Sequence, residues 1–362
     1  MIKPRLVLCS GVNIAQDDPL REERRILELS TRGRHANVNV RIEDVAKALM
    51  GDLSPRLVDL LEIAAYVFTA DCATTRGAEW TDDDTTEPWD RNIKFVIPIR
   101  DLHFWAREEV GQLLTQILQF LSDDNYIFQF RELKKEPSKQ GYLEFGEDED
   151  WPFYGVDRVF MFSGGLDSLA GAAEAAAKGQ KLVLVSHRPV ATQSSRQREL
   201  FETLQKTYPV PMIHVQVWIN KEKRLGREHT QRTRSFLYSA LGTIVAMSVK
   251  AAGIRFFENG IVSLNFPLAD EALRARASRT THPIVLDLFS RLYGLVAERR
   301  IEVDNPFLFK TKSEVISIIA ENGGSELIKR TCSCAHQGFF KSKLRWHCGM
   351  MSRSQLKVAS SS

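Results

Sequence analysis

The chain has 362 residues, of which 43% are hydrophobic and 26% are charged, and its formal net charge is +3 at pH 7. That length predicts two domains with a core that needs no disulfide, and the small net charge excludes an overall affinity for polyanions. No apolar run is long enough to span a bilayer, and no signal peptide is recognisable. Five cysteines are an odd number, which favours a cytoplasmic protein and metal binding over disulfides.

The first half of the chain is expected to form an accessory α+β domain that docks a partner protein. Alternating and continuous apolar runs predict strands at residues 5–9, 37–42, 92–99 and 126–131. Ser54 followed by Pro55 predicts the start of one helix, with serine as the N-cap and proline at the first helical position. Apolar residues at helical spacing predict a second helix over residues 110–121. This half shows no catalytic constellation.

Two cysteines and two acidic stretches in this half are given structural interpretations. Cys9 and Cys72 are interpreted as buried thiols, because a free cysteine is usually a core residue. The acidic stretches 82–84 and 147–150 are interpreted as solvated loops, with a docking patch as the alternative. The second stretch is expected to separate the accessory domain, residues 1–150, from a second domain, residues 151–362.

The second domain begins with the most informative stretch of the chain, Ser163-Gly164-Gly165-Leu166-Asp167-Ser168. An apolar strand precedes it, an alanine-rich helix follows, and residues 181–186 predict a second strand, so a parallel sheet is expected. The two glycines let the backbone approach a ligand, and the amides at the helix start favour an anion. The serines add hydroxyl groups, while Asp167 requires a magnesium ion between its charge and a phosphate. The stretch predicts a site for Mg-ATP, with an ordinary strand-to-helix turn as the alternative.

Further candidates follow at places where strands end or helices begin. Ser186 and His187 end the second strand and are candidates for seating a nucleotide, with a plain polar loop as the alternative. Arg232 precedes a helix over residues 234–245, and an arginine there opposes the helix dipole. A ligand phosphate beside Arg232 would explain its position.

The last candidates lie after a third apolar strand. Glu258, Asn259 and Ser263 form a polar stretch suited to hydrogen-bonding a heterocycle, with a polar turn as the alternative. A basic loop follows, and it contains Arg274, Arg276, Arg279, Thr281 and His282. Thr311 and Glu314 are explained by a capping box, which leaves Lys312 as a candidate ligand contact.

These features together resemble a known family. Ser163 to Ser168, the arginine before Phe236-Leu237, residues 309–314 (Phe-Lys-Thr-Lys-Ser-Glu), Ser333-Cys334 and His347-Cys348-Gly349 resemble the QueC family of 7-cyano-7-deazaguanine synthases over residues 156–350. The extra N-terminal region and Glu258-Asn259-Gly260 are more similar to the QueC-like proteins of bacterial anti-phage systems, the QatC type.

The resemblance implies a doubly wound parallel sheet of the PP-loop ATP-pyrophosphatase (adenine nucleotide alpha hydrolase-like) type. It implies an ATP-dependent ligase that adenylylates the carboxylate of 7-carboxy-7-deazaguanine and passes it to ammonia or to an amine of a partner protein from a defence operon. Nucleic acid is not expected as a direct substrate. The implied catalytic residues are Asp167, Ser168 and Arg232; the ATP site comprises Ser163, Gly164, Gly165, Leu166, Asp167, Ser168, Ser186 and His187; and the substrate contacts are Glu258, Asn259, Ser263 and Lys312.

The zinc site that the resemblance implies is incomplete. The family pattern is an early cysteine followed by HCGxCxxC, whose thiolates suit tetrahedral zinc. Cys334 and Cys348 occupy the first two positions, but Met351 and Ser354 stand at the other two. Cys332, His336 and His347 are alternative ligands, and a non-native C-terminus is a second explanation. The rival functions are a PP-loop enzyme acting on tRNA and a catalytically degenerate nucleotide-binding scaffold of a defence complex.

Overall fold

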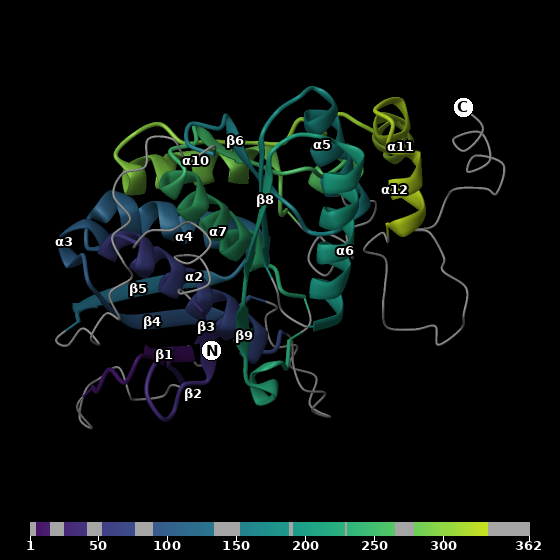
Figure 1. Ribbon diagram of the computed structural model, residues 1–362. Helices are drawn as coiled ribbons and strands as arrows, with labels where there is room; N and C mark the ends of the chain where they lie inside the picture. The colour runs from purple at the N-terminus through teal and green to yellow at the C-terminus, as the bar shows by residue number, and fades with distance from the viewer. Residues whose placement is uncertain are drawn as a thin grey trace.

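The computed structural model describes residues 5–14, 25–41, 53–76, 90–133, 153–187, 191–228, 230–264 and 279–331. Within these ranges the strands form a four-stranded sheet, a five-stranded sheet and a two-stranded sheet. The four-stranded sheet belongs to the first half of the chain and the five-stranded sheet to the second half (Figure 1). Among the described helices, none is long and apolar enough to cross a membrane.

The four-stranded sheet is entirely parallel. Its order is β2-β1-β4-β5, formed by β2 (Arg25–Leu29), β1 (Arg5–Cys9), β4 (Asn92–Ile99) and β5 (Asn125–Glu132). The helices of this half are α2 (Pro55–Ala73), α3 (Leu102–Trp105) and α4 (Glu108–Ser122). The expected α+β architecture is therefore wrong, because parallel strands need helical crossovers and α3 and α4 supply the one between β4 and β5.

The two predicted helices of this half are confirmed and have different surroundings. α4 is amphipathic, and Val110, Leu113, Leu114, Ile117, Leu118 and Leu121 are all buried. α2 starts as predicted at Pro55, although Ser54 makes no side-chain cap hydrogen bond. Every residue of α2 from Asp59 to Ala73 is buried, because the helix lies between the first sheet and α7 (Arg234–Ser248). Cys9 and Cys72 are buried free thiols, as predicted.

The five-stranded sheet is also parallel and has the order β11-β10-β6-β7-β8. Its strands are β6 (Arg158–Met161), β7 (Leu182–His187), β8 (Met212–Val217), β10 (Gly253–Arg255) and β11 (Glu302–Asp304). Its helices are α5 (Leu166–Ala177), α6 (Ala191–Thr207), α7, α8 (Gly260–Leu264), α10 (Pro283–Ala297), α11 (Lys312–Glu321) and α12 (Ser325–Arg330).

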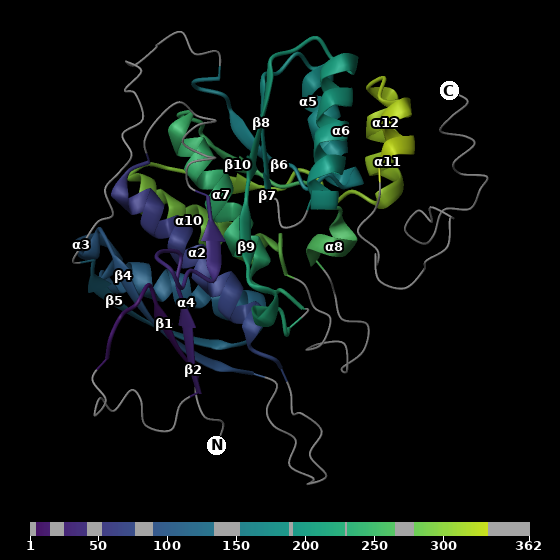
Figure 2. The same cartoon turned by 60° about the horizontal axis from the view of Figure 1, so that its bottom comes forward.

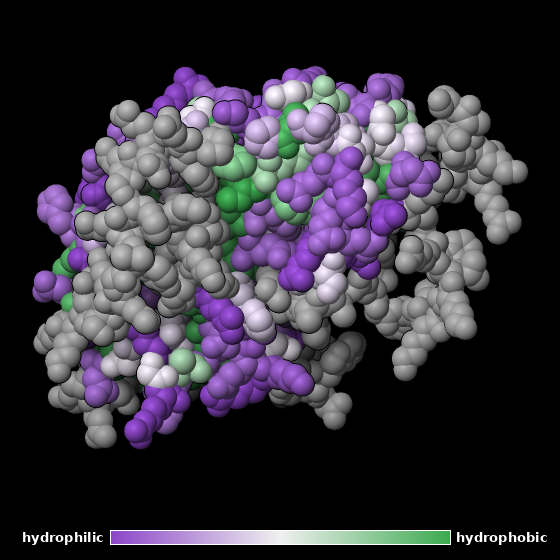
Figure 3. All heavy atoms as spheres, in the orientation of Figure 1, coloured by the Kyte–Doolittle hydropathy of each residue, from purple (hydrophilic) through white to green (hydrophobic). Residues whose placement is uncertain are grey.

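Helices cover both faces of this second sheet, so the fold is doubly wound. Side chains alternate along a strand, and Phe160 of β6 packs with α5, α6 and α11 while its neighbour Val159 packs with α7 and α10. The turned view separates the two groups, with α5, α6, α11 and α12 on one side of the strands and α7 and α10 on the other (Figure 2). Figure 3 shows that the outer face of α6 is hydrophilic.

The two halves of the chain are joined by a strand pair, by packed helices and by a common hydrophobic cluster. β3 (Val38–Val40) pairs in antiparallel fashion with β9 (Ile219–Lys221), which is followed by the short 3-10 helix η1 (Lys223–Leu225). α2 packs on α7 and α4 packs on α10, and one continuous hydrophobic cluster contains residues of both sheets. The expected boundary near residue 150 lies in 134–152, outside the described residues.

Candidate functional site

The candidate site lies where the order of the second sheet reverses. From β6 the chain proceeds to β7 and β8 on one side, and then returns to β10 and β11 on the other side. Ligands of doubly wound sheets bind at the carboxyl ends of the strands beside such a reversal. Ser163–Ser168 follows β6 and Glu258-Asn259 follows β10, so these two predicted stretches flank the reversal point.

The glycine-rich loop has the geometry expected of a phosphate cradle. Gly164 has φ of +78°, in the left-handed region that favours glycine, and Gly165 is the N-cap of α5. The Ser163 hydroxyl accepts from the Gly165 amide at 3.3 Å, and the Ser168 hydroxyl donates to the Gly165 carbonyl at 3.0 Å. The two serine hydroxyls are 3.2 Å apart. The loop is thereby fixed by its own serines.

Gln197 of α6 supports this loop and was not predicted. A Cβ added at Gly164 would lie 3.0 Å from the Cγ of Gln197, so this glycine is required for space as well as for its φ angle. The Gln197 amide nitrogen donates to the carbonyls of Ser163 and His187, at 3.3 Å each. Gln197 is completely buried. It connects the ends of β6 and β7.

Asp167 is the point at which three predicted stretches meet. Its Oδ1 accepts from the Lys312 ammonium at 2.5 Å, and its Oδ2 accepts from the Asn259 side-chain amide at 2.8 Å and its main-chain amide at 3.2 Å. The Asp167 side chain is 13% exposed and that of Lys312 is 33% exposed. The first turn of α5 thus carries a carboxylate that is held by an ammonium and an amide.

Glu258 and Ser263 form an adjoining hydrogen-bond network. Glu258 Oε2 accepts from the hydroxyls of Thr280 at 2.8 Å and Thr281 at 2.7 Å. Burial raises the pKa of Glu258 and the nearby Asp167 raises it further, whereas the two threonine hydrogen bonds lower it. The Ser263 hydroxyl donates to the Glu258 carbonyl at 3.0 Å. A carboxyl group that resists ionisation therefore lies beside the loop.

Asn305 completes this network and was also not predicted. Its side-chain amide donates to the Glu258 carbonyl at 2.8 Å and to the Ser263 hydroxyl at 2.9 Å. Its side-chain oxygen accepts from the Glu258 amide at 3.2 Å. Asn305 follows β11 directly, so the strand-end rule that selected Ser186 and Glu258 could also have selected it. α8 begins at Gly260, so part of the expected polar loop is helical.

Ser186 and His187 lie at the end of β7, but both are buried. The His187 Nε2 donates to the Ile219 carbonyl at 2.8 Å, and the ring packs edge-on against Phe68 and Tyr238. Burial lowers the pKa of His187 to about 3, so the ring is neutral. His187 is therefore not placed to seat a nucleotide, because its side chain is buried and its ring hydrogen-bonds to Ile219, the first residue of β9.

The Ser186 hydroxyl is engaged in the same way. It donates to the Phe162 carbonyl and lies 2.7 Å from Nε2 of His214, a ring whose pKa burial lowers to about 3. Ser186 is 1% exposed. The structure therefore gives this hydroxyl a fixed role at the base of the loop, joining β6 to the neighbouring strands.

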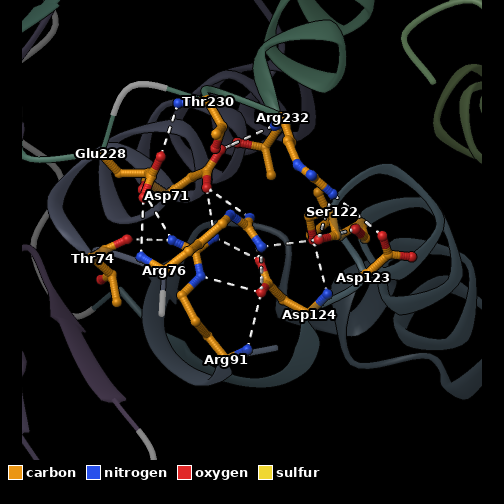
Figure 4. A network of polar contacts seen from close by, with 12 residues as sticks. Asp71, Thr74, Arg76, Arg91, Ser122, Asp123, Asp124, Glu228, Thr230 and Arg232 are labelled. Carbon is orange, nitrogen blue, oxygen red and sulfur yellow. Dashed lines mark hydrogen bonds and ion pairs between the residues drawn. The ribbon is translucent and has the colours of Figure 1, made fainter. Parts of the chain in front are cut away.

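Arg232 lies in a second polar network, shown in Figure 4. Its guanidinium lies 3.3 Å from the carboxylate of Asp123, a residue of the turn after α4. Burial lowers the pKa of Arg232, as does the nearby Arg76, while Asp123 raises it. Arg279 also binds Asp123, at 2.7 Å, and Thr280 next to it contacts Glu258. Arg232 is thus joined to the candidate site through Asp123 and Arg279.

The rest of this network is almost fully buried. Asp71 and Asp124 are both bound by Arg76 and Arg91, at 2.5 to 3.2 Å (Figure 4). The amide and hydroxyl of Thr233 donate to Asp71 at 3.1 and 3.0 Å. Burial alone would raise the pKa of Asp71, but Arg91 and Arg76 lower it below its ordinary value. The network ties the end of α2 to the start of α7.

Some of the residues predicted to hold cofactors lie within the described ranges, and others lie outside them. The carboxylate of Asp167 is an oxygen ligand of the kind that magnesium prefers. Arg274, Arg276 and the expected zinc ligands Cys332, Cys334, His336, His347 and Cys348 lie outside the described residues. Within the described ranges, no group of three or more His, Cys, Asp and Glu residues is arranged to hold a metal ion.

The sequence was also compared with known proteins. No protein-family model matches the chain, and no curated protein matches it.

Proposed function

We propose that this protein is a cytoplasmic, QueC-like PP-loop ATP pyrophosphatase of an anti-phage system. In the proposed reaction, a carboxylate oxygen of 7-carboxy-7-deazaguanine attacks the α-phosphorus of ATP, and pyrophosphate leaves. A nitrogen nucleophile, either ammonia or an amine of a partner protein, then attacks the acyl carbon, and AMP leaves.

The observation that supports this proposal most strongly is the convergence on Asp167. Asp167 comes from the stretch after β6, Asn259 from the stretch after β10, and Lys312 from the start of α11. The side chains of Asn259 and Lys312 both bind the Asp167 carboxylate. The sequence predicts phosphate or substrate contacts in all three of these stretches, which lie far apart in the chain. The site also lies at the sheet reversal, where doubly wound folds bind ligands.

Each side chain has a definite task in this proposal. The amides at the start of α5 bind the pyrophosphate portion of ATP, and Lys312 neutralises charge that develops on it. Magnesium, when bound beside Asp167, would screen the phosphate charge. Arg232 and Arg279 both bind Asp123, so these three side chains together carry one net positive charge. The described side-chain donors to Glu258 are the hydroxyls of Thr280 and Thr281, and both bind Oε2. In this proposal Oε1 accepts a hydrogen bond from the heterocycle.

An Asp167→Ala variant tests the proposal. We expect release of AMP and pyrophosphate to fall by about two to three orders of magnitude, the usual effect of losing a preorganised electrostatic group. Asp287→Ala is the matched control, because Asp287 is an exposed carboxylate on α10. Thermal melting of both variants serves to check that they fold. Unchanged pyrophosphate release from folded Asp167→Ala would refute the proposed site.

A catalytically degenerate scaffold is the second candidate. Met351 and Ser354 at two positions of the zinc pattern favour it. Such a protein would bind ATP but release no pyrophosphate with or without 7-carboxy-7-deazaguanine. Zinc content of the purified chain separates the two candidates further, since about one zinc per chain would show that other ligands complete the site. A tRNA substrate would instead be revealed by a salt-dependent mobility shift of labelled tRNA.

A further inference from the structure

A large groove lies at the sheet of the first half, away from the residues assigned to ATP. Its volume is about 1150 Å³, which is the size class of small-molecule sites or somewhat larger. It is lined by residues along both β1 and β2, from Arg5 and Ile26 near their amino ends to the loops that follow the strands, and by the segment around η1. The first sheet is parallel, and the loops in this lining follow the carboxyl ends of its strands, where parallel sheets bind ligands.

The groove is rich in arginine. Its lining includes Arg5, Arg32, Arg34, Arg224 and Arg227, and the only carboxylate among the described lining residues is Glu28. Two neighbouring carboxylates offset part of this charge, because Glu62 binds Arg32 and Glu222 binds Arg224. The balance remains positive. Arginine presents a planar fork that matches two phosphate oxygens at once.

The inner wall of the groove is held in place by α2. The Tyr66 hydroxyl joins the loops after β1 and β2, since it lies 2.5 Å from the Ser10 hydroxyl and 2.9 Å from that of Thr31. Glu62, one turn earlier, binds Arg32 at 2.5 Å and also Arg100 at 3.1 Å, at the end of β4. Loops from three strands are therefore fixed by one buried helix.

The loops also leave room for a ligand beside the backbone. Gly11 and Gly33 have φ of +71° and +75°, and a Cβ added at either would meet no atom within 4 Å. Ser10 is left-handed as well, at 49°. The amides of Ser10 and Val12 donate to the carbonyls of Leu29 and Cys9, so the capacity of this groove to bind an anion comes from its arginines. No Phe, Tyr or Trp is among the described lining residues, so the groove offers no platform for stacked bases of single-stranded nucleic acid.

We infer that this groove is a second anion site, which binds a phosphorylated small molecule of nucleotide size. Its phosphates would lie between the loop that carries Arg34 and the segment that carries Arg227. Both arginines are exposed, and neither has an ion-pair partner among the described residues, so they are available to a ligand. The inference does not depend on the proposed reaction at Asp167.

Calorimetric titration with inorganic tripolyphosphate tests the inference on the full chain. We expect two binding events, one at each site. The double variant Arg34→Ala/Arg227→Ala is expected to weaken one event about tenfold or more, and Lys312→Ala to weaken the other. The control Arg107→Ala/Arg291→Ala removes the same charge from the N-cap of α4 and from α10, both outside the groove, and should preserve both events.

Three results would overturn the inference. The first is an unchanged titration of the Arg34→Ala/Arg227→Ala protein. The second is an equal loss in the control variant, which would indicate unspecific charge attraction. The third is tighter binding of a glutamate decamer or of single-stranded oligothymidylate than of tripolyphosphate, which would assign the groove to a macromolecule. Far-ultraviolet circular dichroism of each variant serves to check that it is folded.

Discussion

The ammonium of Lys312 lies 2.5 Å from Oδ1 of Asp167, although 145 residues separate them in the chain. This contact joins the start of α11 to the start of α5. The capping box of Thr311 and Glu314 fixes the backbone from which Lys312 projects. The lysine is therefore positioned by local structure and is directed at Asp167 by charge.

Replacing Lys312 with alanine is expected to lower pyrophosphate release by about two to three orders of magnitude, because a preorganised positive charge is lost at the phosphates. Lys310→Ala removes the same charge two residues earlier and should change the rate little. Steady-state assays of both variants give the comparison. Equal rates for the two would show that Lys312 has no part in the reaction.

Gly164→Ala should affect both stability and ATP binding. Gly164 and Gly179 have nearly equal φ, +78° and +77°, but only Gly164 faces a close neighbour, Gln197. Alanine at either position should cost about 1–2 kcal/mol for the left-handed backbone. Urea unfolding should show a larger loss for Gly164→Ala, and only that variant should weaken ATP binding. An equal loss of stability in both, with normal ATP binding, would contradict the cradle geometry.

Acid should destabilise the protein through His187 and His214. Burial lowers the pKa of each to about 3 from an ordinary value of 6.5. A lowered pKa of the folded state means that only the unfolded chain binds these protons between pH 6.5 and 3. The free energy of unfolding should therefore fall as pH falls through that window, by up to about 2.7 kcal/mol per pH unit for two protons.

His187→Phe tests this assignment, since phenylalanine suits a site beside Phe68 and Tyr238. The variant is expected to be less stable at pH 7, because the hydrogen bond to Ile219 is lost. Its pH slope should nevertheless be smaller by about one proton. Urea titrations at several pH values measure the slope. A slope equal to that of the unmodified chain would show that His187 titrates normally in the folded state.

Asp71→Asn should be strongly destabilising. Asp71 is fully buried and binds Arg76 and Arg91, so its loss leaves buried guanidinium groups with less compensation. Breaking such a buried pair costs about 3–5 kcal/mol. The exposed pair of Arg107 and Glu109 provides the control, and Glu109→Gln should cost less than about 1 kcal/mol. Chemical denaturation measures both, and similar values would contradict the structural role of the network.

The sequence was informative where a local rule fixes the outcome. The spacing of Val110 to Leu121 predicted α4, and the strand–glycine–helix order predicted the loop around Gly164. Glu258 and Asn259 were predicted because they follow a strand. Lys312 was predicted because the capping box explains Thr311 and Glu314 but not the lysine between them. Each of these signals spans a few neighbouring residues, and the parallel sheet then brings the strand ends together.

Tertiary contacts decided what the sequence could not. The burial of Ser186 and His187 depends on tertiary contacts, among them the hydrogen bond from the His187 ring to the carbonyl of Ile219 in β9. The partner of Arg232 is Asp123, 109 residues earlier in the chain. The direction of the strands in the first sheet is set by packing rather than by residue pattern. No local rule predicts the burial of His187, the partner of Arg232 or the direction of these strands.

The central claim is that the loop around Asp167 cleaves ATP between the α- and β-phosphates to activate a carboxylate. The most direct test is to separate the products formed from ATP by the purified chain, with and without 7-carboxy-7-deazaguanine. We predict AMP and pyrophosphate, formed only when the carboxylate is present. Formation of ADP and phosphate, or of no product while ATP remains bound, would contradict the claim.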